Sequence, residues 1–160
     1  MNPTIIANEL ALIVGSLTDI DQVDTDSYLP PVLTRTAALV IPPFGQQTRI
    51  DILTTGGSRF EPKQQAGTES HRIRLEIWVK LDTGKLPATI KRARELPTLA
   101  IKAILANPTL NNSVDRVGNY GGGSNSTSIE TETYDRPVTV DGVPYIVIQI
   151  SVGVILYTKV

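Results

Sequence analysis

The clearest hydrophobic pattern in the chain runs through residues 145–157, near the C-terminus. Gln149 and Ser151 stand between aliphatic residues, and the overall alternation is strict. This pattern, rich in β-branched residues, is typical of a strand that buries one face. At ~3.4 Å per residue such a strand would be about 44 Å long, which is unusual for a small domain. Its apolar face would carry Ile146, Ile148, Ile150, Val152, Val154 and Leu156.

Residues 69–81 alternate just as cleanly. One face would carry His71 followed only by aliphatic side chains, from Ile73 to Leu81. The pattern therefore predicts a second strand with one buried face. The opposite face would carry Arg72, Arg74, Glu76, Trp78 and Lys80.

Residues 129–140 are also typical of a strand, and Asp141-Gly142 follows them directly. An Asp-Gly pair between two strands is a strong signal for a two-residue hairpin turn. The C-terminal strand should therefore close a long hairpin. If the turn fixes the register, the opposed pairs are Val140 with Val143, Tyr134 with Gln149, Glu132 with Ser151, and Glu130 with Gly153.

Weaker patterns predict two helices and two short strands. Apolar residues recur at helical spacing in residues 5–17 and 87–106. Pro97 lies inside the second of these segments and is expected to kink the helix or restart it. Short strands are expected at 36–41 and 48–54.

Three segments between these elements favour irregular structure. Residues 19–31 contain four aspartates and end in Pro30-Pro31, which is typical of a solvated connector. Residues 55–68 and 111–128 are rich in glycine and polar residues and are expected to be flexible loops.

Together the elements predict a single α+β domain spanning 1–160, with an antiparallel sheet, a long C-terminal hairpin and helices packed on one face. The other sheet face is either solvated, as antiparallel sheets allow, or lines a channel or meets a neighbouring subunit. Trp78 and Tyr157 favour the second alternative, because exposed aromatic side chains are enriched at interfaces. This face would carry Arg72, Arg74, Glu76, Trp78, Lys80, Glu130, Glu132, Tyr134, Gln149 and Ser151.

Composition narrows the chemistry. The chain has 160 residues, a net charge of −1, no cysteine and one histidine. A disulfide, a thiolate nucleophile and a metal site with two imidazoles from one chain are therefore excluded. No strong global field favours nucleic acid or a membrane, and no run of residues resembles a signal peptide or a membrane span. We expect a soluble, non-secreted protein.

Candidate catalytic and binding motifs are weak. His71 shares the aliphatic face of its strand, so a structural histidine is favoured over a general base. The aspartates after residue 18 do not have calcium-loop spacing, and Gly121–Gly123 lack the lysine of a phosphate loop. Lys91, Arg92 and Arg94 favour a solvated helix face with Glu95 as a local partner. No enzymatic activity, cofactor or metal is expected.

Three segments resemble the tail terminator proteins of tailed bacteriophages, also called tail completion or neck proteins. HRIRLEIWVKL (71–81) is similar to the family's long strand, and LAIKAILANPTLNNSV (99–114) to its main helix and the hook that follows. DGVPYIVIQISVGVILY (141–157) is similar to its C-terminal hairpin. The resemblance covers residues 36–160. It departs from the family at the long glycine-rich segment near Tyr120.

The resemblance implies a structural virion protein that forms a ring, typically a hexamer, at the head-proximal end of the tail. The ring would stop polymerisation of the tail tube protein and join the tail to the neck or connector protein. In contractile tails it would also meet the sheath protein. DNA would pass through it without specific binding, and the protein would lie in the virion after assembly in the host cytoplasm.

Interaction candidates come from the polar sheet face and from the loops. Alternative functions are another tail or neck subunit, such as a tube or connector protein, and a small-ligand-binding domain that uses the polar face. The candidates on the sheet face are Arg72, Arg74, Trp78, Glu130, Glu132 and Tyr134. Those in the loops are Gly56, Gly57, Arg59, Phe60 and Tyr120.

Overall fold

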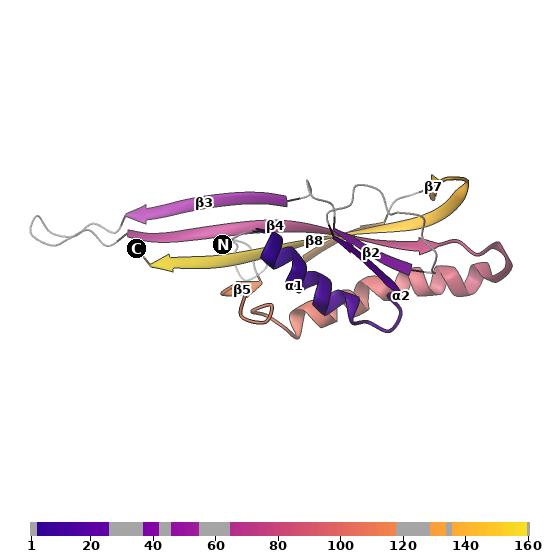
Figure 1. The fold of residues 1–160 in the computed structure, drawn as a ribbon, viewed down its shortest axis with the longest axis horizontal. Coiled ribbons are helices and arrows are strands. Elements are labelled where there is room, and N and C mark those ends of the chain that lie inside the picture. The colour runs from indigo at the N-terminus through magenta and orange to yellow at the C-terminus, as the bar shows by residue number, and fades with distance from the viewer. Residues whose placement is uncertain are drawn as a thin grey trace, which may run out of the picture.

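The structure, a computed structural model, describes residues 3–25, 37–41, 46–54, 65–117, 129–133 and 136–159. It has the expected α+β fold, an elongated molecule with an eight-stranded sheet and two α-helices (Figure 1). The elements in chain order are α1 (Pro3–Gly15), β1 (Gln22–Thr25), β2 (Ala37–Ile41), β3 (Gln46–Thr54), β4 (Gln65–Lys80), the 3₁₀ helix η1 (Thr83–Lys85), α2 (Leu86–Leu105), β5 (Arg116–Val117), β6 (Ile129–Thr133), β7 (Val138–Val140) and β8 (Val143–Lys159).

The two strands with the strongest alternation pair with each other and form the axis of the molecule (Figure 1). β4 and β8 are antiparallel from Ala66 opposite Lys159 to Lys80 opposite Tyr145. The predictions of strands at 69–81 and 145–157 are confirmed. β4 begins earlier than expected, so the predicted loop at 55–68 is wrong for its last four residues. Gly67 pairs with Ile52 on one side and Thr158 on the other, and these backbone ladders do not depend on apolar side chains.

The sheet runs in the order β1-β2-β4-β8, with β5, β6 and β7 on the far side of β8 and β3 beside β4. All pairs are antiparallel except β1 with β2. The expectation of a purely antiparallel sheet is therefore wrong at this edge. The expectation of a solvated connector at 19–31 is also wrong where β1 forms, because Val23 aligns with Leu39 and Ile20 is buried.

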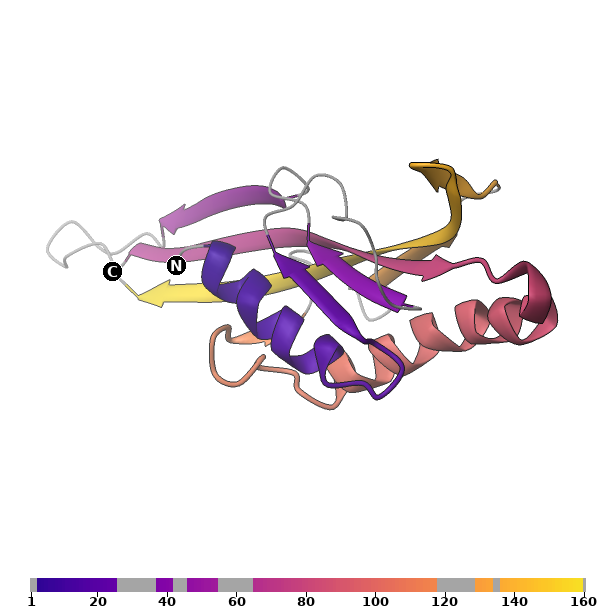
Figure 2. The ribbon, with the colours of Figure 1, turned by 45° about the vertical axis from the view of Figure 1, so that its right-hand side comes forward.

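Both helices cover the same face of the sheet, as expected (Figure 2). Their buried side chains join the inward side chains of β2, β4 and β8 in the main core, which includes Leu10, Leu96 and Ile150. α2 is one continuous helix, so the expected restart at Pro97 does not occur. Leu96 and Ala100 are fully buried on either side of the proline, and this packing holds the helix on the sheet.

The C-terminal hairpin turns at Asp141 and Gly142, whose positive φ angles of 49° and 79° fit the predicted two-residue turn. Val140 pairs with Val143 as predicted. β6 is shifted by two residues from the prediction, and its pairs are Glu130 with Ser151 and Glu132 with Gln149. The β6 ladder ends at Thr133 opposite Ile148, and the β7 ladder begins at Val138 opposite Tyr145. Four residues, 134–137, therefore lie between the two ladders on one side of the hairpin, and only 146 and 147 lie between them on the other, which accounts for the shift of two. An even shift keeps every side chain on its predicted face.

The predicted loop at 111–128 is confirmed at 111–115, which are turns and bends, and is wrong at 116–117, where β5 forms. Asp115 donates its backbone N–H to the Ile155 carbonyl at 3.1 Å, and Val117 donates to Pro108 at 2.7 Å. Val114 is buried in the main core. The segment turns back through Leu110, Asn111 and Asn112, which all have positive φ, and β5 then docks on β8.

Candidate interaction surfaces

The outward face of the ribbon carries a strip of paired charges between β4, β8 and β6. Arg72 Nη1 lies 3.2 Å from Glu130 Oε2, and both side chains are largely exposed. Exposed ion pairs of this kind add little to the free energy of unfolding, and the strip stays accessible to solvent.

Further along the strip, Arg74 Nε lies 3.6 Å from Glu76 Oε1. Gln149, with its carboxamide oxygen turned toward Arg74, accepts from Arg74 Nε and Nη1, both at 3.1 Å. Glu132 is exposed on the neighbouring strand. A hollow of about 270 Å³ lies here, lined by Glu130, Thr131, Glu132, Gln149 and Ser151. Its volume is close to the lower end of the about 300–1,000 Å³ range of ordinary small-ligand pockets.

Trp78 is not an exposed interface residue, and that expectation is wrong. It is 5% exposed and lies in a second apolar cluster on the outward face. Its ring meets the Tyr145 ring edge-on at a centroid distance of 5.7 Å, and its Nε1 donates to Glu76 Oε2 at 3.1 Å. β2 contributes Ala38 and Val40 to the same cluster.

Several hairpin residues complete this cluster. Val138, Val140 and Val143 pack against it, and the β7–β8 tip turns away from the helix layer (Figure 2). Burial raises the pKa of the Tyr145 hydroxyl, and the nearby Asp141 carboxylate raises it further. The outward face is therefore apolar and covered at one end and polar along its middle.

Tyr157 keeps the exposure that Trp78 lacks. Its side chain is about half exposed, and the Arg116 guanidinium stands 5.9 Å from the ring centroid. A cation at this distance attracts the electron-rich face of the ring. The expectation of an exposed aromatic on the outward face holds at Tyr157.

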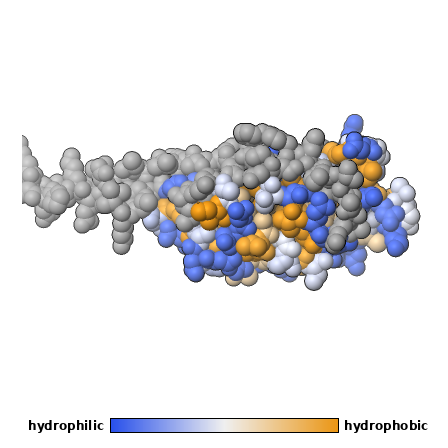
Figure 3. Space-filling model, in the orientation of Figure 1, coloured by the Kyte–Doolittle hydropathy of each residue, from blue (hydrophilic) through white to orange (hydrophobic). Residues whose placement is uncertain are grey.

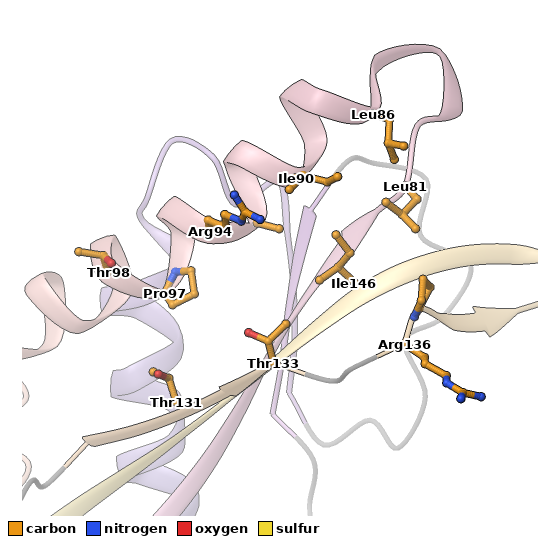
Figure 4. Close-up of a pocket in the computed structure, with 12 residues that line it drawn as sticks. Leu81, Leu86, Ile90, Arg94, Pro97, Thr98, Thr131, Thr133, Arg136 and Ile146 are labelled. Atoms are coloured by element: carbon orange, nitrogen blue, oxygen red, sulfur yellow. The ribbon is translucent and has the colours of Figure 1, made fainter.

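A groove that the sequence analysis did not identify separates α2 from the edge strand β6. Figure 4 shows side chains from α2, β6 and the start of β8 facing this space, whose volume is about 730 Å³. Leu86, Ile90, Arg94 and Pro97 form its helix side, and Arg136 lies at its strand side with the guanidinium directed away from α2 (Figure 4). The remaining lining residues are Leu81, Ala93, Thr98, Thr131, Thr133, Pro137 and Ile146.

The opposite side of the molecule carries an exposed stripe on α1 that consists of Ile5, Asn8 and Leu12. Ile5 is 48% exposed and Leu12 is 65% exposed, two turns apart on one helix face. Asn8 lies exposed between them and is the one polar member of the α1 stripe. Figure 3 shows hydrophobic patches among hydrophilic residues on the side of the molecule that displays α1.

The other sequence candidates divide into two groups. His71 is buried, with Nε2 2.6 Å from Glu69 Oε1, which fits the structural histidine that was favoured. Lys91 pairs with Glu95 as expected, at 3.8 Å, whereas Arg92 donates to the Asp19 carbonyl at 2.6 Å and ties α2 to the segment before β1. The interaction candidates Gly56, Gly57, Arg59, Phe60, Tyr120 and Tyr134 lie outside the described residues.

Among the residues of the described ranges, no group of three or more histidine, aspartate or glutamate side chains is placed to hold a metal ion. Within the same ranges, neither helix has the length and hydrophobicity to cross a bilayer. Compared with known proteins, the sequence matches no family model and no curated protein.

Proposed function

We propose that the protein is a structural subunit of a tailed-bacteriophage virion, a tail terminator that forms a closed ring at the head-proximal end of the tail. The ring would end polymerisation of the tail tube and join the tail to the neck. The resemblance of the two long strands, the main helix and the C-terminal hairpin to that family motivates the proposal. The role is one of assembly, not catalysis.

The observation that carries the proposal is the β4–β8 ribbon. Its paired stretch, at ~3.4 Å per residue, is about 50 Å long and runs past the end of the helix layer (Figure 1). β3 extends the projecting part to three strands. A ring between tube and neck needs subunits that hold separate contact surfaces rigidly at opposite ends, and a long paired ribbon does this.

Docking to the tube is assigned to the segment between β3 and β4. The β3–β4 ladder ends where Thr54 pairs with Gln65, so residues 55–64 can be replaced by Asn-Gly, which suits a two-residue hairpin turn. We expect the variant to keep the circular dichroism spectrum and melting temperature of the wild type and to lose binding to tail tubes. A variant that unfolds, or that still binds tubes, would count against this role.

The direct test uses purified tube protein from the same phage. Added during tube polymerisation, the chain should shorten the tubes, and electron micrographs should show one extra ring at one end of each. A variant with the same net charge and an intact fold, such as Ser151→Ala, is the control and should cap equally well. Tubes of unchanged length with no terminal density would contradict the proposal.

The alternative within the same class is a tube or connector subunit. A tube subunit polymerises with itself, because a heterologous interface that does not close gives an open filament. Light scattering of the purified protein at rising concentration separates the two: a tube subunit gives growing signal, and a terminator ring gives a plateau at one particle size.

A further inference from the structure

The α1 stripe and the groove beside α2 lie on opposite lateral sides of the subunit. The sheet order places β1 at one edge and β6 at the other. α1 packs on α2 and contacts β1, β2 and part of β4, whereas α2 contacts β4 and β8. The groove opens between α2 and β6, at the edge away from α1. A subunit with two different surfaces on opposite sides is built for head-to-tail contact.

The two surfaces match in their chemistry. The α1 stripe presents Ile5 and Leu12 as apolar anchors two helical turns apart, with the Asn8 carboxamide between them. The groove presents aliphatic side chains from α2 and β8, among them Leu86, which is 42% exposed. It also carries the Thr131 and Thr133 hydroxyls, which are suitable hydrogen-bond partners for a carboxamide. A helix laid in an apolar groove, with anchors at this spacing, is a common mode of protein recognition.

Their charges match as well. Glu9 is the one charged residue of α1, and it lies beside the α1 stripe, where its carboxylate accepts from Asn111 Nδ2 at 2.9 Å. The groove carries Arg94 and Arg136. Within the part of the chain that the structure describes, neither arginine has a carboxylate partner. Glu9 beside the α1 stripe and Arg94 beside the groove are opposite charges, which favours this pairing over like-charged alternatives.

We propose that α1 of one subunit docks in the groove between α2 and β6 of a second copy of this chain, and that repetition of this contact closes the ring. The inference rests on the proposed ring function and names the interface that builds it. The contact is heterologous, as a ring requires.

A simpler interface would continue the sheet, with the β1 edge of one copy paired to the β6 edge of the next. Acidic side chains at the two edges argue against it. Asp24 aligns with Val40 and so shares the outward face with Glu130 and Glu132. Continuing the sheet would place these carboxylates side by side, and like charges on neighbouring strands are destabilising. The helix layer therefore carries the contact.

Two point variants break opposite halves of the interface. Leu12→Asp places a charge on the α1 stripe and leaves the groove intact. Leu86→Asp does the reverse, and an acidic residue in the first turn of α2 is compatible with the helix dipole. Each variant alone should require at least about tenfold more protein to form rings in mass photometry. Leu99→Asp, at a similarly exposed leucine in the middle of α2 and outside the groove, is the matched control and should leave ring formation near the wild-type level.

Mixing the two variants gives the decisive result. One intact stripe and one intact groove remain between unlike subunits, so an equimolar mixture should form dimers that cannot grow. An interface elsewhere predicts no dimer specific to the mixture, and a wild type that stops at dimers would show an isologous contact in place of a ring. Circular dichroism of each variant must match the wild type, and the mixed dimer itself shows that both variants are folded.

The outcomes separate this inference from the proposed function. If both variants still form wild-type rings, the interface lies elsewhere and the ring function stands. If the wild type stays monomeric at every concentration, the α1–groove contact is overturned, and the tube-capping test decides the function independently. A charge swap adds a second check: Glu9→Arg and Arg94→Glu should each weaken the ring, and the double variant should restore it.

Discussion

The two faces of the sheet differ in how they are covered. The inward face of β4 and β8 packs against both helices and forms the main core, in which Leu75 and Ile150 are fully buried. The outward face has no helix over it in the described residues. It buries an apolar cluster around Trp78 and, further along β8, Ile155, and between them lies a polar strip that runs from Arg72 to Gln149.

The difference shows that the sequence reveals which face of a strand a residue occupies more readily than what covers that face. Alternation along a strand fixes which residues share a face, because successive side chains point to opposite sides. What covers that face depends on segments far away in the chain. Trp78 has the expected parity, but it is buried beside Ala38 and Val40 of β2 in a cluster against which residues of the hairpin tip pack.

The largest effect should come from the inward face. Ile150→Ala removes a fully buried side chain from the main core, and we expect it to lower the free energy of unfolding by about 4 kcal/mol. Ser151→Ala, the next residue on the outward face, should change it by less than about 0.5 kcal/mol. Urea denaturation of both variants measures the contrast. Equal effects would mean that the faces are assigned wrongly.

The second largest effect tests whether the outward cluster is a genuine core. Trp78→Ala should lower the free energy of unfolding by about 3 kcal/mol, because a buried indole and its hydrogen bond to Glu76 are lost. Trp78 is the only tryptophan, so its emission should also be blue-shifted in the folded protein and shift to the red on unfolding. A solvent-like emission spectrum in the native state would place Trp78 back at the surface.

The hairpin tip that closes the outward cluster depends on its turn. Gly142 has φ of +79° and open space around it, so Gly142→Ala should cost about 1 kcal/mol through backbone strain alone. Gly84→Ala is the control: its φ is not positive and the new Cβ would make an ordinary contact at 3.4 Å. Thermal melts of the two variants should differ accordingly, and an equal response would remove the case for strain at the turn.

Alkaline pH probes the same cluster more gently. Because the pKa of Tyr145 is raised in the folded protein, the fold favours the neutral phenol. This contribution is complete below the unfolded-state pKa of about 10 and is lost as the pH rises through the folded-state value. The wild type should therefore lose stability above pH 10 more steeply than Tyr145→Phe. Parallel curves would show that Tyr145 is not buried.

The smallest effect is expected on the polar strip. Arg72→Ala breaks an exposed ion pair with Glu130 and should change the free energy of unfolding by at most about 0.5 kcal/mol. The change should shrink further in high salt, because exposed charges are screened. Urea titrations with and without added salt measure both quantities, and a loss comparable to that of Trp78→Ala would mean that the strip is covered.

Local patterns predicted the two long strands, α2, the Asp141-Gly142 turn and the face of every residue in the ribbon. They did not predict β1, whose four residues pair in parallel with a strand that begins twelve residues further along the chain. The register of β6 was also missed, because the extra residues before Pro137 have no local signature.

The interaction surfaces were less predictable than the fold. The unbroken apolar run of β2 was a usable signal, since a strand buried on both faces implies cover on the outward side. The groove combines residues from α2, β6 and the start of β8, so no single segment reveals it. The α1 stripe was hidden because Asn8 interrupts it and apolar residues surround most of that helix.

Electron microscopy of the purified protein tests the central claim most directly. Class averages should show closed rings with one fixed number of subunits, and the particle mass should not grow with concentration. Monomers across the whole concentration range, or open filaments of variable length, would contradict a ring-forming terminator.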